Sequence, residues 1–418
     1  MVRSLLPLTA LLMGSAFLLF AGGLNGLILP VRGEAEGFTA ASLGLLGTGW
    51  AIGYVAGCLG TPRLVARVGH IRSFGAMCAI AAIAVLLSLL LITPWVWIPV
   101  RALSGFCFAG AAMIVESWLN ERAEAGSRGR IFGVYTMVNL FASTAGQMSL
   151  TLGDASGYVF FVIAAMVYCL ALLPTAMSAT MTPKPLTQVS LNLRALWRNS
   201  PVAVFSVFMI GIANASFGTL AAVYGARIGL SLSDIALFAS IPILAGAVAQ
   251  IPVGYLSDKF ERRKVLIGVA LVAVVADGLF IMAGEPGRTL VLALVALFGA
   301  SVFAMYPVIV AHANDHAEPG SFIQVSGGLL LVFGLGSILG PTLAGYAMTA
   351  YGAATLFAVI GVAHVLLIVF AILRLRTTAA VPKAQKTDFQ AGPLARSQTP
   401  ETLALAADPE TGQPESTP

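Results

Sequence analysis

The sequence predicts an all-α polytopic membrane protein in which twelve transmembrane helices form two six-helix bundles. Three observations lead to this fold class. The 418 residues are 58% hydrophobic and only 10% charged, whereas a soluble domain carries about 25% charged residues. Twelve apolar stretches follow one another, each near the length of about 20 residues that crosses a bilayer. Polar positions of the first half recur in the second half at a nearly constant offset.

The twelve predicted spans are separated by short polar connections. They cover residues 8–30, 41–61, 73–93, 95–118, 131–152, 158–178, 202–225, 233–256, 264–284, 289–312, 322–348 and 354–375. The first span follows Arg3, as the core of a secretory signal sequence would. It is too long for such a core and has a counterpart in the second half. We therefore expect a retained helix.

Basic residues are distributed unevenly between the connections. Nineteen of the 23 lysines and arginines fall in the terminal segments and in the connections that share one side of the membrane. The other side holds only Arg32, Arg227 and Arg288. Basic residues accumulate on the cytoplasmic side. The bias predicts a multi-pass protein of a bacterial inner membrane with both termini in the cytoplasm, and it explains the net charge of +5 without nucleic-acid binding.

The two halves of the chain repeat each other. Matches at an offset of 192 residues include Gly37 with Gly229, Thr39 with Ser231, Arg67 with Lys259 and Arg72 with Lys264, and matches at 194 include Gly105 with Gly299, Asn120 with Asn314 and Glu121 with Asp315. Duplicated six-span halves are typical of transporters. The predicted domains are an N-terminal bundle (1–178), a cytoplasmic linker (179–201), a C-terminal bundle (202–376) and a disordered, polar cytoplasmic tail (377–418).

The connection between the eighth and ninth spans reads Gly254-Tyr-Leu-Ser-Asp258-Lys259-Phe-Glu-Arg262-Arg263-Lys264. Its glycine permits close helix packing, and its aspartate can bind a base across a bundle interface. The first-half copy retains Arg67 and Arg72 but has Pro62 and Ala66 in place of the glycine and aspartate. We expect these seven residues to act in gating, with the weight on Asp258: Gly254, Asp258, Lys259, Arg262, Arg263, Arg67 and Arg72. A purely topological role is the alternative.

An arginine lies inside the fourth span, in Arg101-Ala-Leu-Ser-Gly105. Arg101 is six residues past Trp95, or about 9 Å below the outer boundary. An arginine at that depth costs a few kcal/mol unless it faces a cavity or a partner. Two interpretations stay open: a substrate anchor, or a side chain that extends to the outer headgroups.

These motifs resemble the major facilitator superfamily, over about residues 5–376. The loop at 254–264 is similar to its signature loop, and Arg101 with Gly105 to its motif on the fourth helix. Glu116-Ser-Trp118, Tyr306-Pro307 and the glycine-rich run from Ser326 to Gly345 resemble the bacterial YcaD-type group. The resemblance implies alternating access of a central cavity by two rocking bundles that act as a monomer.

Under this resemblance the fourth helix lines the cavity, and Glu116 lies near its cytoplasmic end. A buried carboxylate there is a proton-coupling candidate. Pairing with Arg67, Arg128 or Arg130 in a cytoplasmic gate is the alternative. Other polar residues lie on helices expected to face the cavity and are predicted to bind substrate together with Arg101: Asn25, Asn139, Gln147, Asn214, Ser216, Gln250 and Tyr306.

Small residues mark close helix crossings in the predicted bundles. The candidates are Gly105, Gly340, Pro341 and Gly345. Asp277, on the ninth span, is expected to make only a local hydrogen bond. The sequence contains no nucleotide-binding loop, no Ser-His-Asp arrangement and no metal-ligand spacing, because the four cysteines lie in apolar stretches. We therefore expect no enzyme activity, no cofactor and no metal.

The predicted function is secondary active transport, as symport or antiport, of a small neutral or anionic organic solute across a lipid bilayer, with protons as the coupling ion. Two alternatives stay open. One is proton-driven efflux of amphiphilic drugs, for which Glu116 is the carboxylate candidate. The other is a transporter-like sensor that signals through its tail.

Overall fold

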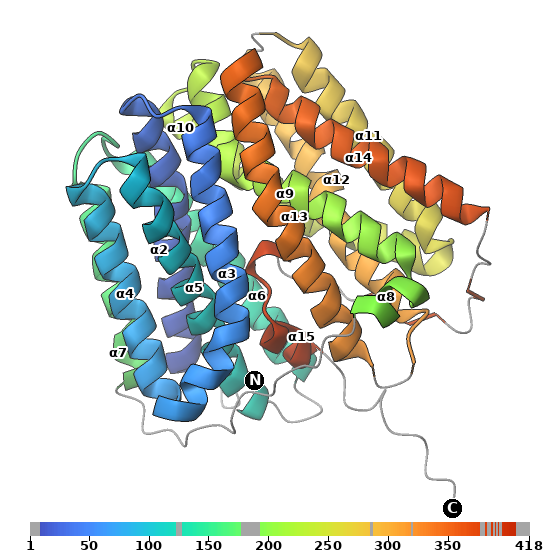
Figure 1. The fold of residues 1–418 in the computed structure, drawn as a ribbon, viewed down its shortest axis with the longest axis horizontal. Coiled ribbons are helices and arrows are strands. Elements are labelled where there is room, and N and C mark those ends of the chain that lie inside the picture. The colour runs from blue at the N-terminus through green and yellow to red at the C-terminus, as the bar shows by residue number, and fades with distance from the viewer. Residues whose placement is uncertain are drawn as a thin grey trace, which may run out of the picture.

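The computed structural model describes residues 9–122, 128–176, 193–284, 287–318 and 321–376, and in the tail residues 381–382, 386–387, 389, 392 and 395–406. The first bundle consists of α2 (Thr9–Ala35), α3 (Ala40–Val68), α4 (His70–Leu90), α5 (Pro94–Arg122), α6 (Arg128–Met148) and α7 (Val159–Ala176). The second consists of α9 (Pro201–Arg227), α10 (Leu232–Lys259), α11 (Arg262–Met282), α12 (Arg288–Asn314), α13 (Phe322–Tyr351) and α14 (Thr355–Leu375). Figure 1 shows the two bundles side by side.

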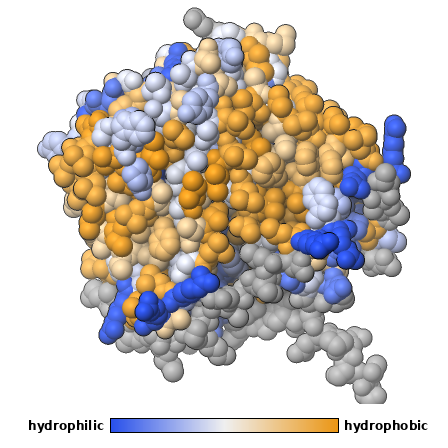
Figure 2. All heavy atoms as spheres, viewed as in Figure 1, coloured by the Kyte–Doolittle hydropathy of each residue, from blue (hydrophilic) through white to orange (hydrophobic). Residues whose placement is uncertain are grey.

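Most of these helices are built to cross a membrane. Ten of them are long and apolar enough to do so, and α7 is apolar but shorter. Helix α6 is less apolar because it carries Tyr135, Asn139, Ser143 and Gln147. Apolar residues cover the middle of the face seen in Figure 2, and hydrophilic residues gather toward its two ends. The predicted all-α, polytopic fold is confirmed in the described part of the chain.

The two bundles share one local design. Helix α3 begins at Ala40 and α10 at Leu232, an offset of 192 residues. Thr39 caps the first by accepting a hydrogen bond from the Ser42 amide, and Ser231 caps the second in the same way from Asp234. The packing of α3 on α5 and of α2 on α7 recurs as α10 on α12 and α9 on α14. The repeated polar positions are therefore structural caps.

The bundles present two faces to the aqueous phases. We call the face that carries the α3–α4 and α10–α11 connections, together with the short helix α8 (Leu193–Asn199), the linker face. The face that carries the α2–α3 and α9–α10 connections is the opposite face. Because each bundle has six long helices, the chain returns to the linker face at α8 before it enters the second bundle (Figure 1).

The bundles contact each other closely in their opposite-face half. A Cβ on Gly44 of α3 would lie 2.2 Å from the Pro341 carbonyl oxygen of α13, and one on Gly345 would lie 2.5 Å from the Ala40 carbonyl. The Thr48 hydroxyl donates to the Ile338 carbonyl at 2.7 Å. Backbone therefore touches backbone there, as small residues permit.

Hydrogen bonds and one ion pair add to this contact. The Thr48 hydroxyl also lies 2.7 Å from that of Thr342. At the outermost turn, Arg227 Nε of the second bundle pairs with Glu34 Oε1 of the first at 2.8 Å. The remaining helix-packing candidates join helices of the same bundle, Gly340 against Ile212 and Gly105 against the Trp50 carbonyl.

The tail differs from the predicted disorder where the structure describes it. The C-terminal segment (residues 395–406) comprises the short turn η5 (Ala395–Ser397) and helix α15 (Pro400–Ala406). Helix α15 packs against α5, α6 and α13 (Figure 1). Leu403 and Leu405 are buried. Two leucines in a seven-residue helix are too few to create the apolar periodicity on which the prediction relied.

Candidate functional site

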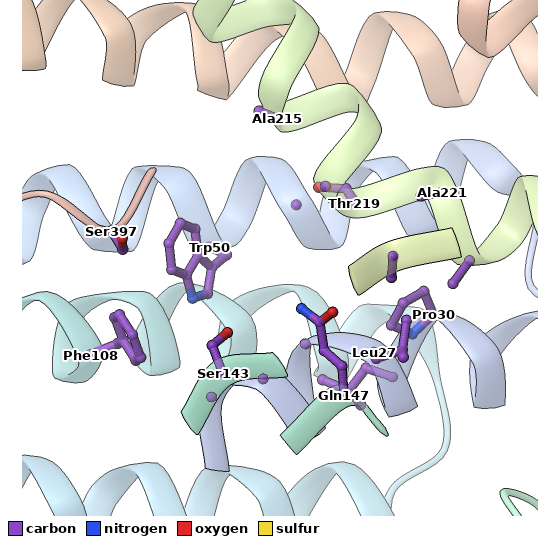
Figure 3. Close-up of a pocket in the computed structure, with 18 of the residues that line it drawn as sticks. Leu27, Pro30, Trp50, Phe108, Ser143, Gln147, Ala215, Thr219, Ala221 and Ser397 are labelled. Atoms are coloured by element: carbon purple, nitrogen blue, oxygen red, sulfur yellow. The ribbon is translucent and has the colours of Figure 1, made fainter. Parts of the chain in front are cut away.

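A cavity of about 160 Å³ lies between the bundles. Figure 3 shows Trp50 of α3, Phe108 of α5, Ser143 and Gln147 of α6 and Thr219 of α9 around it. Other lining residues are mostly glycines and leucines. Glycines let helices approach and leave concave space. The result is a mainly apolar chamber with a few polar groups, the usual character of a small-molecule site.

Three of the predicted substrate-binding residues line this cavity: Arg101, Asn139 and Gln147. Asn139 Oδ1 accepts a hydrogen bond from the Ser15 hydroxyl at 2.7 Å. Gln147 Oε1 accepts one from Ser240 of α10 at 2.9 Å. Gln147 thus joins the bundles, whereas Arg101 is the cationic residue among the described lining residues. The lining contains no Asp or Glu within the part of the chain that the structure describes.

The other predicted substrate-binding residues lie outside the lining. Asn25 and Asn214 are buried within α2 and α9. The Ser216 hydroxyl donates to the Ile212 carbonyl at 2.7 Å, so Ser216 serves the crossing with α13. Tyr306 packs edge-on against Phe333 with ring centroids 5.7 Å apart. Helix identity alone did not predict which side of each helix faces the cavity.

Gln250 contacts the tail. Its side-chain amide donates to the Gly392 carbonyl at 3.2 Å and accepts from the Gly392 amide at 3.0 Å. This pairing is the backbone-like recognition that an amide side chain provides. In this conformation Gln250 therefore binds the chain's own tail.

Glu116 is fully buried near the linker-face end of α5. Oε1 accepts hydrogen bonds from Tyr135 at 2.8 Å and from Thr402 at 2.7 Å. Oε2 accepts one from Thr399. No ion pair of Glu116 with Arg67 or Arg130 occurs among the described side chains, so the predicted arginine gate is not formed in this conformation. The carboxylate is satisfied by hydroxyl groups instead.

A second cavity of about 340 Å³ adjoins the first on its linker-face side. Trp50, Ala51 and Ser337 line both cavities. Cys58 and Arg63 of α3 and Gly327 of α13 continue the wall toward the linker face, and Ala395 and Pro400 close it. Sequence reasoning missed Trp50, Phe108 and the C-terminal segment as parts of this space, because aromatic residues in apolar spans carry no signal that separates cavity from core.

The conserved-looking charged loop is organised around Arg262, whose side chain is 1% exposed. Arg262 Nε pairs with Asp315 Oδ2 at 2.7 Å, and Nη1 lies 3.3 Å from Asp258 Oδ1. Asp315 is 2% exposed, but Asp258 is 47% exposed. Both partners belong to the second bundle, so the loop does not latch the bundles together here. Asp315, predicted only to end its helix, provides the buried charge.

The other gating candidates lie around this cluster or on the first bundle. Arg263 donates to the Arg374 carbonyl at 3.1 Å. Lys259 lies over the Tyr255 ring at 5.7 Å, and a Cβ on Gly254 would meet the ring of Phe389 from the tail. Arg67 and Arg72 are exposed, on α3 and α4 respectively. In this conformation these side chains do not meet across the bundles.

The described residues contain no group of three or more His, Cys, Asp or Glu side chains that could hold a metal ion. The four cysteines are unpaired thiols. Asp277 Oδ2 lies 2.7 Å from Nδ1 of the buried His364, within the second bundle. Asp277 therefore makes a local hydrogen bond, and its histidine partner was not predicted.

Two six-helix bundles around a central cavity suggest a transporter family, and the sequence decides which one. The profile described as "Major Facilitator Superfamily" matches residues 11–246 and 203–405. The chain belongs to the major facilitator superfamily. An MFS-type transporter of Enterobacter sp. (strain 638) is 28% identical over 359 residues, which are 85% of this chain and 92% of that protein. The MFS-type transporter YcaD of Salmonella heidelberg (strain SL476) is 26% identical over the same shares. The predicted family and its YcaD-type likeness are confirmed.

Solved superfamily structures share the fold. The nucleoside transporter NupG has a TM-score of 0.71 at 17% identity and covers 88% of this chain and 99% of its own. A bacterial homologue of the lysosomal transporter Spinster, in an inward-facing and occupied conformation, has a TM-score of 0.71 at 17% identity and covers 92% and 98%. These identities support a common fold only. The chain is thus a multi-pass membrane transporter of this superfamily.

The Arg262 cluster yields a stability prediction. Asp315→Asn leaves a buried guanidinium without its closest charge, and we expect a loss of about 3 kcal/mol in the free energy of unfolding. Asp258→Asn is the matched control and is expected to cost at most about 1 kcal/mol, because Asp258 is half exposed. Unfolding in detergent measures both variants. An equal or larger effect at Asp258 would contradict this account of the loop.

Proposed function

We propose that this protein is a secondary transporter that moves a small organic solute by alternating access. The observation that carries the proposal is the cavity between the bundles, which holds Arg101, Asn139 and Gln147. The closest glycine contacts between the bundles lie beyond this cavity, toward the opposite face. A solute in the cavity is therefore shielded from one face and is reached from the other, which is the geometry that a rocking-bundle cycle requires.

We assign the linker face to the cytoplasm of a bacterial inner membrane. The support is the excess of lysine and arginine in the connections of that face. The conformation is then inward-facing. To open outward, the bundles must separate Gly44 from Pro341 and break the Arg227–Glu34 pair. Differences in solute affinity between the two states would drive that exchange.

We propose protons as the coupling ion and Glu116 as their carrier. Glu116 is a fully buried carboxylate within a membrane-spanning helix, bound only by hydroxyl groups in the described part of the chain. A carboxylate in such a place is costly and usually functional. Hydroxyl groups can accept from its protonated form as well as donate to its ionised form, so both states can be accommodated.

The cavity favours a neutral or anionic solute. Arg101 supplies positive charge, amide groups of Asn139 and Gln147 supply hydrogen bonds, and the described lining has no acid. Efflux of amphiphilic compounds is the second candidate. The apolar wall formed by Trp50, Phe108, Phe217 and Phe303 favours it, but a hydrophobic cation would lack a counter-charge in the central cavity.

Removing the Arg101 side chain tests the cargo class. We expect a solute from a panel of organic acids, sugars and amphiphilic antibiotics to raise the melting temperature of the full chain in detergent, because it binds the folded state. Arg101→Ala should weaken that solute about 10- to 100-fold, the value of a hydrogen bond to a charged group. Arg130→Ala, on the exposed part of α6, is the control. Unchanged affinity in Arg101→Ala would remove Arg101 from the binding site.

Neutralising Glu116 tests the coupling. In liposomes, a pH gradient should accelerate uptake of the best-binding solute by the full chain. Glu116→Gln should abolish this acceleration while solute exchange continues, because glutamine cannot carry a proton. Glu121→Gln, exposed at the end of the same helix, is the matched control. Because Glu116 also contacts the tail, the pair of variants is compared in the full chain and in a chain that ends at residue 394. A preserved gradient response in Glu116→Gln would exclude it as the proton carrier.

A further inference from the structure

The C-terminal segment lies inside the space through which a solute would leave. Ser397 lines the central cavity, and Ala395 and Pro400 line the second cavity on its linker-face side. Figure 3 shows Ser397 beside Trp50, the residue common to both cavities. Figure 1 shows α15 between the two bundles at the linker face. The segment therefore occupies the path between the cavity and this face.

The first bundle holds the segment through four hydrogen bonds. Thr399 and Thr402 both donate to the Glu116 carboxylate. The Tyr54 hydroxyl donates to the Gln398 carbonyl at 2.7 Å. Thr402 also caps its own turn by accepting from the Thr399 amide at 2.8 Å. A short helix with such specific partners is positioned by them, since seven residues are too few for a stable isolated helix.

The second bundle holds the residues that precede the segment. Thr387 donates from its amide and its hydroxyl to Asp315 Oδ1, each at 2.9 Å. Lys386 donates to the Ser257 carbonyl at 3.1 Å. Gly392 pairs with the Gln250 amide group, as described above. The described tail thus contacts the second bundle first and the first bundle afterwards, and so bridges the two.

The buried side chains of the segment are of mixed character. Leu403 and Leu405 are buried against the bundles, and Thr399 and Thr402 are at most 1% exposed. Every one of these threonine hydroxyls has a partner. Apolar burial and satisfied polar groups together describe a fitted ligand rather than a loosely resting chain end.

We propose that the C-terminal segment is an autoinhibitory plug that binds the inward-facing cavity and must leave before a solute can pass. The proposal rests on the proposed transport function. In the plugged state the Glu116 carboxylate is occupied by Thr399 and Thr402 and is closed to the cytoplasm, so neither solute nor a coupled proton exchanges there. The bridge also opposes the rocking of the bundles, because outward opening would close the space that the segment fills.

The docking is sensitive to pH through Glu401. Burial and the nearby Glu116 charge raise the pKa of Glu401 to about 7. A carboxyl whose pKa is raised in the docked state stabilises docking at low pH, and this contribution is lost as the pH rises through about 7. The titratable groups on the surrounding elements are Glu116 on α5, Tyr135 on α6 and Tyr54 and Cys58 on α3. The plug should therefore be released in alkaline conditions.

Alkylation of Cys58 tests the plug without any knowledge of the cargo. Cys58 lines the second cavity beneath Ala395 and Pro400, and the other cysteines are replaced by alanine. N-ethylmaleimide should react at least about tenfold faster with a chain ending at residue 394 than with the full chain, because a covered thiol reacts only from the opened state. A chain ending at residue 406 keeps the whole segment and is the matched control. It should react as slowly as the full chain.

Two further variants keep the test decisive. Thr399→Val with Thr402→Val retains the chain length and removes both hydroxyl donors to Glu116, so it should also accelerate alkylation, even if the shortened chain fails to fold. Glu401→Gln should keep Cys58 protected above pH 8, where the unaltered segment is released. Rates are expressed relative to the chain ending at residue 394, which cancels the ionisation of the thiol.

Equal alkylation rates in the full chain, in both shortened chains and in the double valine variant would overturn the plug. This result would leave the transport proposal untouched, because the assay measures access to Cys58 and not solute movement. Conversely, fast alkylation only after loss of residues 395–406 would support the plug even if the solute panel failed to identify a cargo.

Discussion

The contact between α3 and α13 in the opposite-face half is the constraint on which the rest of the structure depends. Gly44 and Gly345 allow backbone to touch backbone there, and a side chain at either position would collide with a carbonyl of the other bundle. The Thr48–Thr342 hydrogen bond and the Arg227–Glu34 pair close the same half. Since membranes provide no hydrophobic force between helices, such packing and hydrogen bonds decide where bundles meet. The cavity remains between the bundles because they meet so closely at one end.

Glu116 connects the cavity with the chain terminus. A carboxylate inside a membrane-spanning helix needs partners, and the described partners are three hydroxyl groups. Only Tyr135 comes from the same bundle, whereas both threonines come from the C-terminal segment. Release of the segment therefore changes the solvation of Glu116. Under our proposals the residue that carries the proton is also the one that holds the plug, so regulation and coupling act on one group.

The sequence predicted the features that follow from composition and repetition, and it failed where side-chain direction decides. Span lengths and the repeat of Thr39 at Ser231 predicted the architecture, since caps and apolar lengths are local properties. Arg101 lines the cavity as predicted, because an intramembrane charge has few other places. Ser216 was predicted to face the cavity but bonds its own helix. The role of Asp315 and the docking of the tail depend on contacts between residues 72 or more positions apart, which no local pattern contains.

The central claim is that the opposite-face contact opens when the linker face closes. Electron–electron distance measurements on spin labels test it directly, with labels at Ala35→Cys and Tyr351→Cys for the opposite face, and at Ala66→Cys and Lys264→Cys for the linker face, in a chain lacking the native cysteines. We expect two distance populations at each face. Conditions that lengthen the distance across the opposite face, such as alkaline pH or a bound solute, should shorten the distance across the linker face. A single, unchanged distance at both faces under all these conditions would contradict the account.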